Sequence, residues 1–253
     1  PFTLEGLSRY QLNQQLLNTL IEEQDVSAMF RRFRAAGELP YGAFGELVWE
    51  TQRLEMQALA ERVMAERQQA QSMEIDLQCG GVNLTGWLQQ VQPDGLLRWR
   101  PSLLSVSQGM QLWLEHLVYC ASGGTGESRL FVRKEGEWRF PPLAPAEAQA
   151  YLNELVDGYL LGMSQPLLLL PESGGAWLKA CYDAEKDVIL MDEETQQKAR
   201  SKFLQTYEGN MVVSGEGADI WYQRLWRSLE PAHYEEIIAQ TQRYLLPLYR
   251  YHQ

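Results

Sequence analysis

The sequence predicts a mixed fold of the α/β (α+β) class, in which helices precede and follow a meander-like sheet. Apolar residues recur at helical spacing up to about residue 69 and again over most of the C-terminal part. Between these parts, short runs of alternating apolar and polar residues are separated by Gly and Pro turns. The 253 residues contain no internal repeat and no low-complexity linker, so we expect one domain over residues 1–253. Because the first residue is Pro1 rather than Met, we expect this domain to be a fragment of a longer chain.

Three helices are expected before the sheet. The first covers Leu4 to Glu23, where apolar side chains lie one helical turn apart. Asp25 favours an N-cap for a second helix, which ends near Gly37. After a turn, a third and longer helical pattern covers about Ala43 to Gln69.

Five short strands follow, joined by turns and by one helix. Gly80-Gly81 separates the first two strands, and Pro93-Asp94-Gly95 favours a tight turn before the third. Ser107 is the expected N-cap of a helix that ends near Ala121, and a glycine-rich loop leads from that helix to the fourth strand. The expected strands cover residues 73–79, 82–91, 96–100, 129–133 and 138–140.

The C-terminal part of the sequence is mainly helical. After a proline break at residues 142–145, we expect a helix to about Leu161. A buried strand or packed loop is expected from Pro166 to Pro171. The remaining helices are expected over Glu193–Tyr207, Ile220–Leu229 and Tyr234–Leu246.

Composition and charge restrict the class of protein. The formal net charge is −11, and so negative a surface repels phosphates, which disfavours a free-standing DNA-binding module. Three widely spaced cysteines without a Cys-x-x-Cys pair favour buried thiols in a reducing compartment over disulfides or zinc. The longest apolar run, Leu167 to Leu170, is too short to span a bilayer. We therefore expect a cytoplasmic protein.

Motifs for nucleotide binding, acyl hydrolysis and metal binding are absent from the sequence. There is no Gly-Lys pair for a P-loop and no Gly-x-Ser-x-Gly elbow. The histidines at positions 116, 233 and 252 lack the spacing of a zinc site, so we expect satisfied or solvated side chains. No Asp or Glu stands two residues before any of the five lysines. We predict no catalytic residue, no metal ligand and no cofactor.

One strand–turn–strand–helix segment carries an unusual set of polar residues. Gln89 lies on the second expected strand, Arg98 and Arg100 on the third, and Gln111 in the following helix. The segment resembles the active-site frame of RecB-type nucleases of the PD-(D/E)xK class. In that family carboxylates on adjacent strands hold Mg²⁺, and a lysine orients the attacking water. Here Gln89 replaces the first aspartate, and Arg98 and Arg100 replace Asp-x-Lys. The resemblance implies a nuclease-like core, flanked by helices, whose catalytic residues are lost.

Longer segments resemble one family over essentially the whole chain. They are Phe30–Glu46, Gln92–Pro101, Gln111–Tyr119, Pro171–Leu178, Tyr207–Asn210 and Ile220–Trp226. They are similar to the C-terminal domain of the RecC family, the γ subunit of exodeoxyribonuclease V (RecBCD). The resemblance implies a non-catalytic role in DNA repair and homologous recombination, with RecB and RecD as partners and no membrane. It also implies contact with double-stranded DNA ends and single strands in the full complex, where RecC scaffolds the other subunits, helps split the duplex and channels the strands.

Local arginines are candidates for a DNA-facing patch despite the negative net charge. Arg98 and Arg100 are two residues apart on one expected strand, so their side chains share a face. The other candidates surround the next hairpin and are Arg129, Arg133, Lys134 and Arg139. An equally good interpretation makes these residues solvated strand arginines or partners for nearby acids.

The C-terminal helices, from about Ile220, are candidates for an interface with a partner, above all with RecD. Aromatic side chains are enriched at such interfaces, and the candidates are Trp221, Trp226, Tyr249 and Tyr251. The alternative, favoured for both tryptophans, is that the aromatics fold back onto the core. Two other function classes remain open: a protein interaction module without direct DNA contact, and a degenerate enzyme with a reassigned site.

Overall fold

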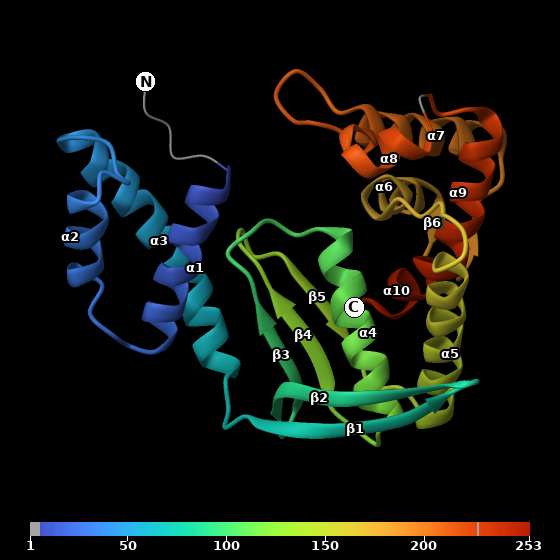
Figure 1. The fold of residues 1–253 in the computed structure, drawn as a ribbon, viewed down its shortest axis with the longest axis horizontal. Coiled ribbons are helices and arrows are strands. Elements are labelled where there is room, and N and C mark those ends of the chain that lie inside the picture. The colour runs from blue at the N-terminus through green and yellow to red at the C-terminus, as the bar shows by residue number, and fades with distance from the viewer. Residues whose placement is uncertain (1–5, 227) are drawn as a thin grey trace. The chain divides into compact units, whose positions relative to one another are not determined.

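The computed structural model describes residues 6–226 and 228–253, so the expected helix start at Leu4 lies outside the described residues. The fold separates into two compact units. Figure 1 labels the helices and strands of both. The first unit comprises Pro1–Met73, Leu88–Leu104 and Gly126–Arg139, and the second comprises Glu74–Trp87, Ser105–Thr125 and Phe140–Gln253. The expectation of one domain over residues 1–253 stays a prediction.

Three helices form most of the first unit: α1 (Gly6–Ile21), α2 (Ser27–Ala35) and α3 (Ala43–Glu66). The expected N-cap at Asp25 is corrected, because the N-cap of α2 is Val26, which makes no side-chain capping bond. Asp25 lies one residue earlier, and its Oδ1 accepts a hydrogen bond from the Ser27 backbone N–H at 2.9 Å. This bond lowers the pKa of the Asp25 carboxyl. α1 packs on α3, and their buried face includes Leu12, Leu16, Leu17, Met56, Leu59 and Val63. Burial of this apolar face, rather than helix propensity, holds the helices together.

The five expected strands are all present: β1 (Gln71–Cys79), β2 (Val82–Gln92), β3 (Gly95–Trp99), β4 (Glu127–Phe131) and β5 (Glu137–Phe140). They form one sheet in the order β1-β2-β3-β4-β5. The pair β2 and β3 is antiparallel, whereas β3 and β4 are parallel, so the sheet is mixed and the expected meander is corrected. The reason lies in the connection, because a parallel pair needs a crossover and residues 100–126, which contain a helix, supply one.

A tight turn precedes β3, as the Pro-Asp-Gly sequence predicts. Gly95 has a φ of 128°, in the region that favours glycine. It stands opposite Glu127 in the parallel pair, and the Glu127 N–H donates to the Asp94 carbonyl oxygen at 2.9 Å. The two backbones approach so closely here that only a residue without a Cβ fits.

The second unit is mainly helical, as expected. Its helices are α4 (Val106–Ala121), α5 (Pro145–Gly162), α6 (Pro171–Cys181), α7 (Glu193–Glu208), α8 (Ile220–Leu225), α9 (Pro231–Tyr244) and α10 (Leu246–Tyr251). A short 3₁₀ turn (Glu216–Ala218) and a two-stranded sheet of β6 (Tyr182–Asp183) and β7 (Val188–Ile189) were not expected. Residues 166–170 form a loop rather than a strand. Helix α4 packs on α5, α6 and α10, and α6 packs on α7 and α9.

The start of α4 corrects one expectation. Its N-cap is Ser105, not Ser107, and Ser105 forms a capping box with Gln108. Ser107 instead donates its hydroxyl to Glu172, whose carboxylate also accepts the Val106 and Ser107 N–H groups at 3.0 and 2.9 Å. A carboxylate from α6 therefore satisfies the first free donors of α4, where the helix dipole favours negative charge.

An aromatic cluster around Trp113 forms the centre of the second unit. Trp113 is buried, and its ring lies 5.1 Å from Phe140, 5.8 Å from Tyr151 and 5.5 Å from Tyr251, measured between centroids. The Tyr251 ring stacks on Trp113, so the C-terminal helix α10 contributes to this core.

Candidate functional site

Gln89, Arg98 and Arg100, which the sequence predicts to stand at the nuclease Asp and Asp-x-Lys positions, lie in the first unit. Arg98 on β3 donates to two carbonyl oxygens of β2, those of Gln89 at 2.8 Å and Gln90 at 3.2 Å. Gln90 has a φ of 56°, so the strand departs from regular geometry where the guanidinium binds. The Gln89 side chain accepts a hydrogen bond from the Ser72 hydroxyl at 2.6 Å. At these positions a carboxamide and a guanidinium therefore make hydrogen bonds within the sheet.

The other two positions of the frame have structural surroundings as well. Arg100 lies directly after β3, half-buried, and its backbone N–H donates to the Phe131 carbonyl oxygen at 3.0 Å. Gln111 belongs to the second unit, on the exposed side of α4. Among residues 6–226 and 228–253 no group of three or more His, Cys, Asp or Glu side chains is placed to hold a metal ion. No helix in the same ranges is both long and apolar enough to cross a membrane.

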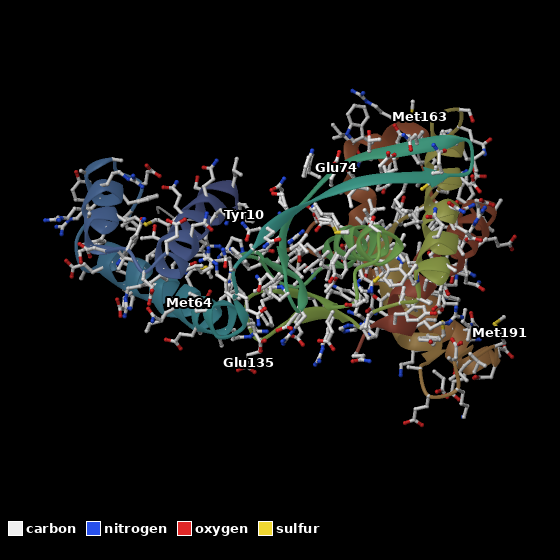
Figure 2. All side chains as sticks on the ribbon, turned by 90° about the horizontal axis from the view of Figure 1, so that it is seen from below. Tyr10, Met64, Glu74, Glu135, Met163 and Met191 are labelled. Atoms are coloured by element: carbon white, nitrogen blue, oxygen red, sulfur yellow. The ribbon has the colours of Figure 1, made fainter. Side chains whose placement is uncertain are left out.

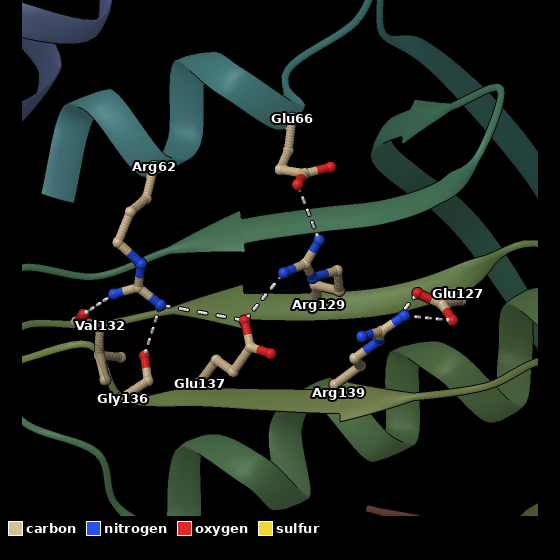
Figure 3. A network of polar contacts seen from close by, with 8 residues as sticks. All are labelled: Arg62, Glu66, Glu127, Arg129, Val132, Gly136, Glu137 and Arg139. Carbon is tan, nitrogen blue, oxygen red and sulfur yellow. Dashed lines mark hydrogen bonds and ion pairs between the residues drawn. The ribbon is translucent and has the colours of Figure 1, made fainter. Parts of the chain in front are cut away.

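Most of the candidate DNA-binding arginines face carboxylates of their own unit. Arg129 lies 3.2 Å from Glu66 and 3.0 Å from Glu137, between α3 and β5 (Figure 3). Arg62 of α3 donates to the Val132 carbonyl oxygen at 3.0 Å and lies 3.9 Å from Glu137. These contacts join α3 to the β4–β5 edge of the sheet, so Arg129 has a structural role.

The neighbouring arginines are paired in the same way. Arg139 binds both carboxylate oxygens of Glu127 at 2.9 and 3.0 Å, and these hydrogen bonds raise the pKa of its guanidinium (Figure 3). Arg133 Nη2 lies 2.7 Å from Glu55 Oε2, a close ion pair. A paired guanidinium has part of its charge neutralised, so these residues are weaker phosphate ligands than isolated arginines.

A basic groove in the first unit was missed at the sequence level. We use this name for the cavity of about 430 Å³ whose lining includes Arg9, Tyr10, Arg133 and Lys134. No carboxylate belongs to its described lining, and Arg9 and Lys134 are exposed. Arg9 comes from α1 and Lys134 from the turn before β5, so only the tertiary fold brings them together.

The C-terminal aromatic candidates differ in exposure. Trp221 is 64% exposed, whereas Trp226 is 8% exposed and donates its Nε1–H to the Tyr207 hydroxyl at 3.0 Å. Tyr249 and Tyr251 are half-buried, and Tyr251 bonds to the Glu147 carboxylate besides stacking on Trp113. Of the four, Trp221 alone presents most of its side chain to solvent.

His116 is a satisfied core residue, one of the two outcomes expected from the sequence. Its side chain is fully buried in α4, and Nε2 lies 2.9 Å from the Pro141 carbonyl oxygen, to which it donates in the neutral tautomer. Burial lowers the pKa of His116 to about 4. Because the unfolded chain has the ordinary pKa near 6.5, it takes up a proton first as the pH falls.

We expect this difference to make stability depend on pH. The contribution of neutral His116 to the free energy of unfolding is fully present above about pH 6.5. It falls as the pH drops towards 4, and about 2 kcal/mol of it is lost at pH 5. Between pH 6.5 and 5, the free energy of unfolding measured in urea should decline less for the His116→Gln variant than for the unsubstituted protein. The difference should be this same amount. His233→Gln, at a half-buried histidine elsewhere, serves as the control, and equal pH slopes in all three proteins would refute the assignment.

Comparison with known proteins shows the family to which the chain belongs. A family model described as the RecC C-terminal domain matches residues 1–182. The chain therefore belongs to the RecC C-terminal domain family, as the sequence resemblance indicated.

Two relatives cover all or nearly all of the chain. It is 72% identical over 253 residues to the RecBCD enzyme subunit RecC of Escherichia coli K12 and 32% identical over 247 residues to that of Buchnera aphidicola from Acyrthosiphon pisum. The chain spans 22% and 23% of the length of these two relatives. A more distant match, to RecC of Haemophilus influenzae, is 22% identical and covers 63% of the chain.

Proposed function

We propose that this chain is a non-catalytic scaffold and DNA-handling domain of a RecBCD-type helicase–nuclease in double-strand break repair and homologous recombination. In this proposal it contributes to subunit assembly with RecB and RecD and to the splitting and channelling of DNA strands in a cytoplasmic complex. Family membership supports the assignment to a RecBCD-type complex, because the two most similar relatives cited above are named as RecC subunits of RecBCD.

The observation that carries the non-catalytic part is the pairing of Arg98 with β2. A nuclease of the PD-(D/E)xK class needs carboxylates at this strand pair to hold Mg²⁺. Here Arg98 donates to the carbonyl oxygens of Gln89 and Gln90, and Gln89 accepts from Ser72. A positive charge held at this point repels a metal ion. We propose a nuclease-like core whose polar positions have become structural.

The DNA-handling part of the proposal rests on the basic groove. Its two exposed cations, Arg9 and Lys134, have no ion-pair partner among the residues that the structure describes, and Tyr10 also belongs to its lining. Phosphate contacts by such residues position a nucleic acid without reading its sequence. Lys134 remains a candidate on this ground, and Arg133 lines the groove but is paired with Glu55, whereas Arg129 and Arg139 are better explained as structural.

Charge reversal tests this assignment. In the assembled RecBCD-type complex, Arg9→Glu with Lys134→Glu should weaken DNA-end binding and reduce the salt slope of log affinity by about 2, one for each lost phosphate contact. The control is Lys198→Glu with Lys202→Glu, which makes the same charge change on α7. The measurement is a titration of a labelled duplex end at several salt concentrations.

The second candidate function is a protein interaction module without direct DNA contact. It is favoured by the net charge of −11 and by the pairing of Arg129, Arg133 and Arg139 with carboxylates. An unchanged salt slope in the Arg9 and Lys134 variant would support it over DNA handling. For the proposed RecD interface, Trp221 is the candidate that the structure leaves exposed, and the buried Trp226 is not.

A further inference from the structure

The second unit contains a large apolar groove that none of the roles above uses. The α4–α5 groove, as we call it, has a volume of about 820 Å³ and is lined by α4, α5, the start of β2 and the loop at residues 166–170. All of these segments belong to the second unit. Trp113, Leu152 and Tyr244 form its buried base, so the groove is built on the rigid core of the unit.

Large apolar side chains along this groove are exposed to solvent. Leu114 is 44% exposed, Tyr159 is 67% exposed and Met163 is 71% exposed. A contiguous apolar surface of this kind on a folded protein marks an interaction site or an aggregation hazard. Pockets for small polar ligands carry several convergent polar groups, whereas no Asp, Glu, His, Lys or Arg belongs to the described lining of this groove. The lining therefore fits an apolar stretch of polypeptide.

A buried hydroxyl at the base of the groove also points to an occupant. Tyr244 is 4% exposed, and its Oη has no hydrogen-bond partner among the described parts of the chain. An unsatisfied buried hydroxyl is costly, because it has lost its water without gaining a partner. A backbone or side-chain polar group of the occupant would satisfy it.

We propose that the α4–α5 groove holds an apolar segment of the same RecC-type polypeptide, from the part outside this domain. The relatives are several times longer than this chain, which spans only 22% and 23% of them. A covalently attached segment is present at high effective concentration and covers the groove as soon as both parts fold. A subunit that arrived later would leave this apolar surface exposed until assembly.

The charge around the groove describes the occupant further. Helix α5 carries the acids Glu147, Glu154 and Asp157 and no Lys or Arg, although Tyr251 bonds to Glu147 and Arg243 lies 3.6 Å from Glu154. Electrostatic complementarity therefore favours a segment with apolar side chains facing the groove and basic residues beside them. An apolar contact of this kind is characteristic of permanent interfaces.

Photo-crosslinking in the full-length polypeptide, purified without other subunits, tests the proposal. A benzophenone side chain is placed at position 163 or, as the control, at position 191. Met163 and Met191 are 71% and 74% exposed and lie well apart on the second unit (Figure 2). We expect position 163 to form intramolecular cross-links to a peptide outside residues 1–253, independent of protein concentration, and position 191 to form none.

Hydrogen exchange provides a second measurement that does not depend on the cross-linker. In the full-length chain, Met163→Glu should speed exchange of residues 152–163 at least about tenfold by releasing the segment, and Met191→Glu should not. Cross-links that end within residues 1–253, that join two copies, or that form only after RecB or RecD is added would overturn the proposal. So would the absence of any cross-link from position 163.

Discussion

Trp113→Ala should lower the free energy of unfolding by about 3–5 kcal/mol, the cost of removing a large aromatic side chain from a packed core. The effect should be at the upper end because Trp113 is 2% exposed and four rings surround it: those of His116, Phe140, Tyr151 and Tyr251. These rings come from separate segments of the second unit, so none can move into the cavity without disturbing the others.

Urea unfolding followed by near-ultraviolet circular dichroism measures this loss. Trp87→Ala is the matched control, because Trp87 is 61% exposed on β2 and its removal should change stability by no more than about 0.5 kcal/mol. Trp113→Phe keeps much of the packing and should lie between the two. Equal stabilities of the Trp113→Ala and Trp87→Ala proteins would show that the aromatic cluster is not the core.

Gly95→Ala should cost about 4 kcal/mol, at the extreme of single substitutions. A Cβ at Gly95 would lie 1.7 Å from the Glu127 carbonyl oxygen and 2.7 Å from the Glu127 N, both backbone atoms. The φ of 128° adds strain for any residue with a side chain. Relief requires β3 and β4 to separate at the end of the parallel pair, with loss of the Glu127 to Asp94 hydrogen bond.

A second glycine of the sheet provides the control for this prediction. Gly86 on β2 has open space around a Cβ and no positive φ, so Gly86→Ala should be neutral within about 1 kcal/mol. Thermal unfolding of both variants gives the comparison. A Gly95→Ala protein as stable as Gly86→Ala would mean that β3 and β4 do not pair as described.

Local features of the fold could be predicted from local sequence. The turn at Gly95, the five strands and the start of α3 at Ala43 all follow from patterns within a few residues. The N-cap of α4 could also have been predicted, because Ser105 and Gln108 have the spacing of a capping box. The prediction of Ser107 as the N-cap was wrong. The parallel pair of β3 and β4 was not predicted, although the helix expected between these two strands is long enough to form the crossover that such a pair needs.

The candidate site could be predicted only in part, because the contacts of its side chains involve residues that are distant in the sequence. The sequence placed Gln89 and Arg98 on successive strands, but it did not indicate that Arg98 donates to the Gln89 and Gln90 carbonyl oxygens, where the backbone at Gln90 is irregular. The partner of Arg133 is Glu55, and the basic groove joins Arg9 to Lys134. No spacing rule relates residues so far apart in the chain. Net charge and local runs of arginine therefore could not predict which cations remain exposed.

The buried cysteines make thiol alkylation a probe of local unfolding in the second unit. Cys79, Cys120 and Cys181 are all 2% exposed or less, and all three belong to the second unit. Burial raises the pKa of the Cys120 thiol, and it raises that of Cys181 to about 11, so the reactive thiolate is scarce in the folded state. Alkylation therefore requires opening of this unit, and the alkylation rate reports how often it opens. The first unit contains no cysteine and contributes no signal.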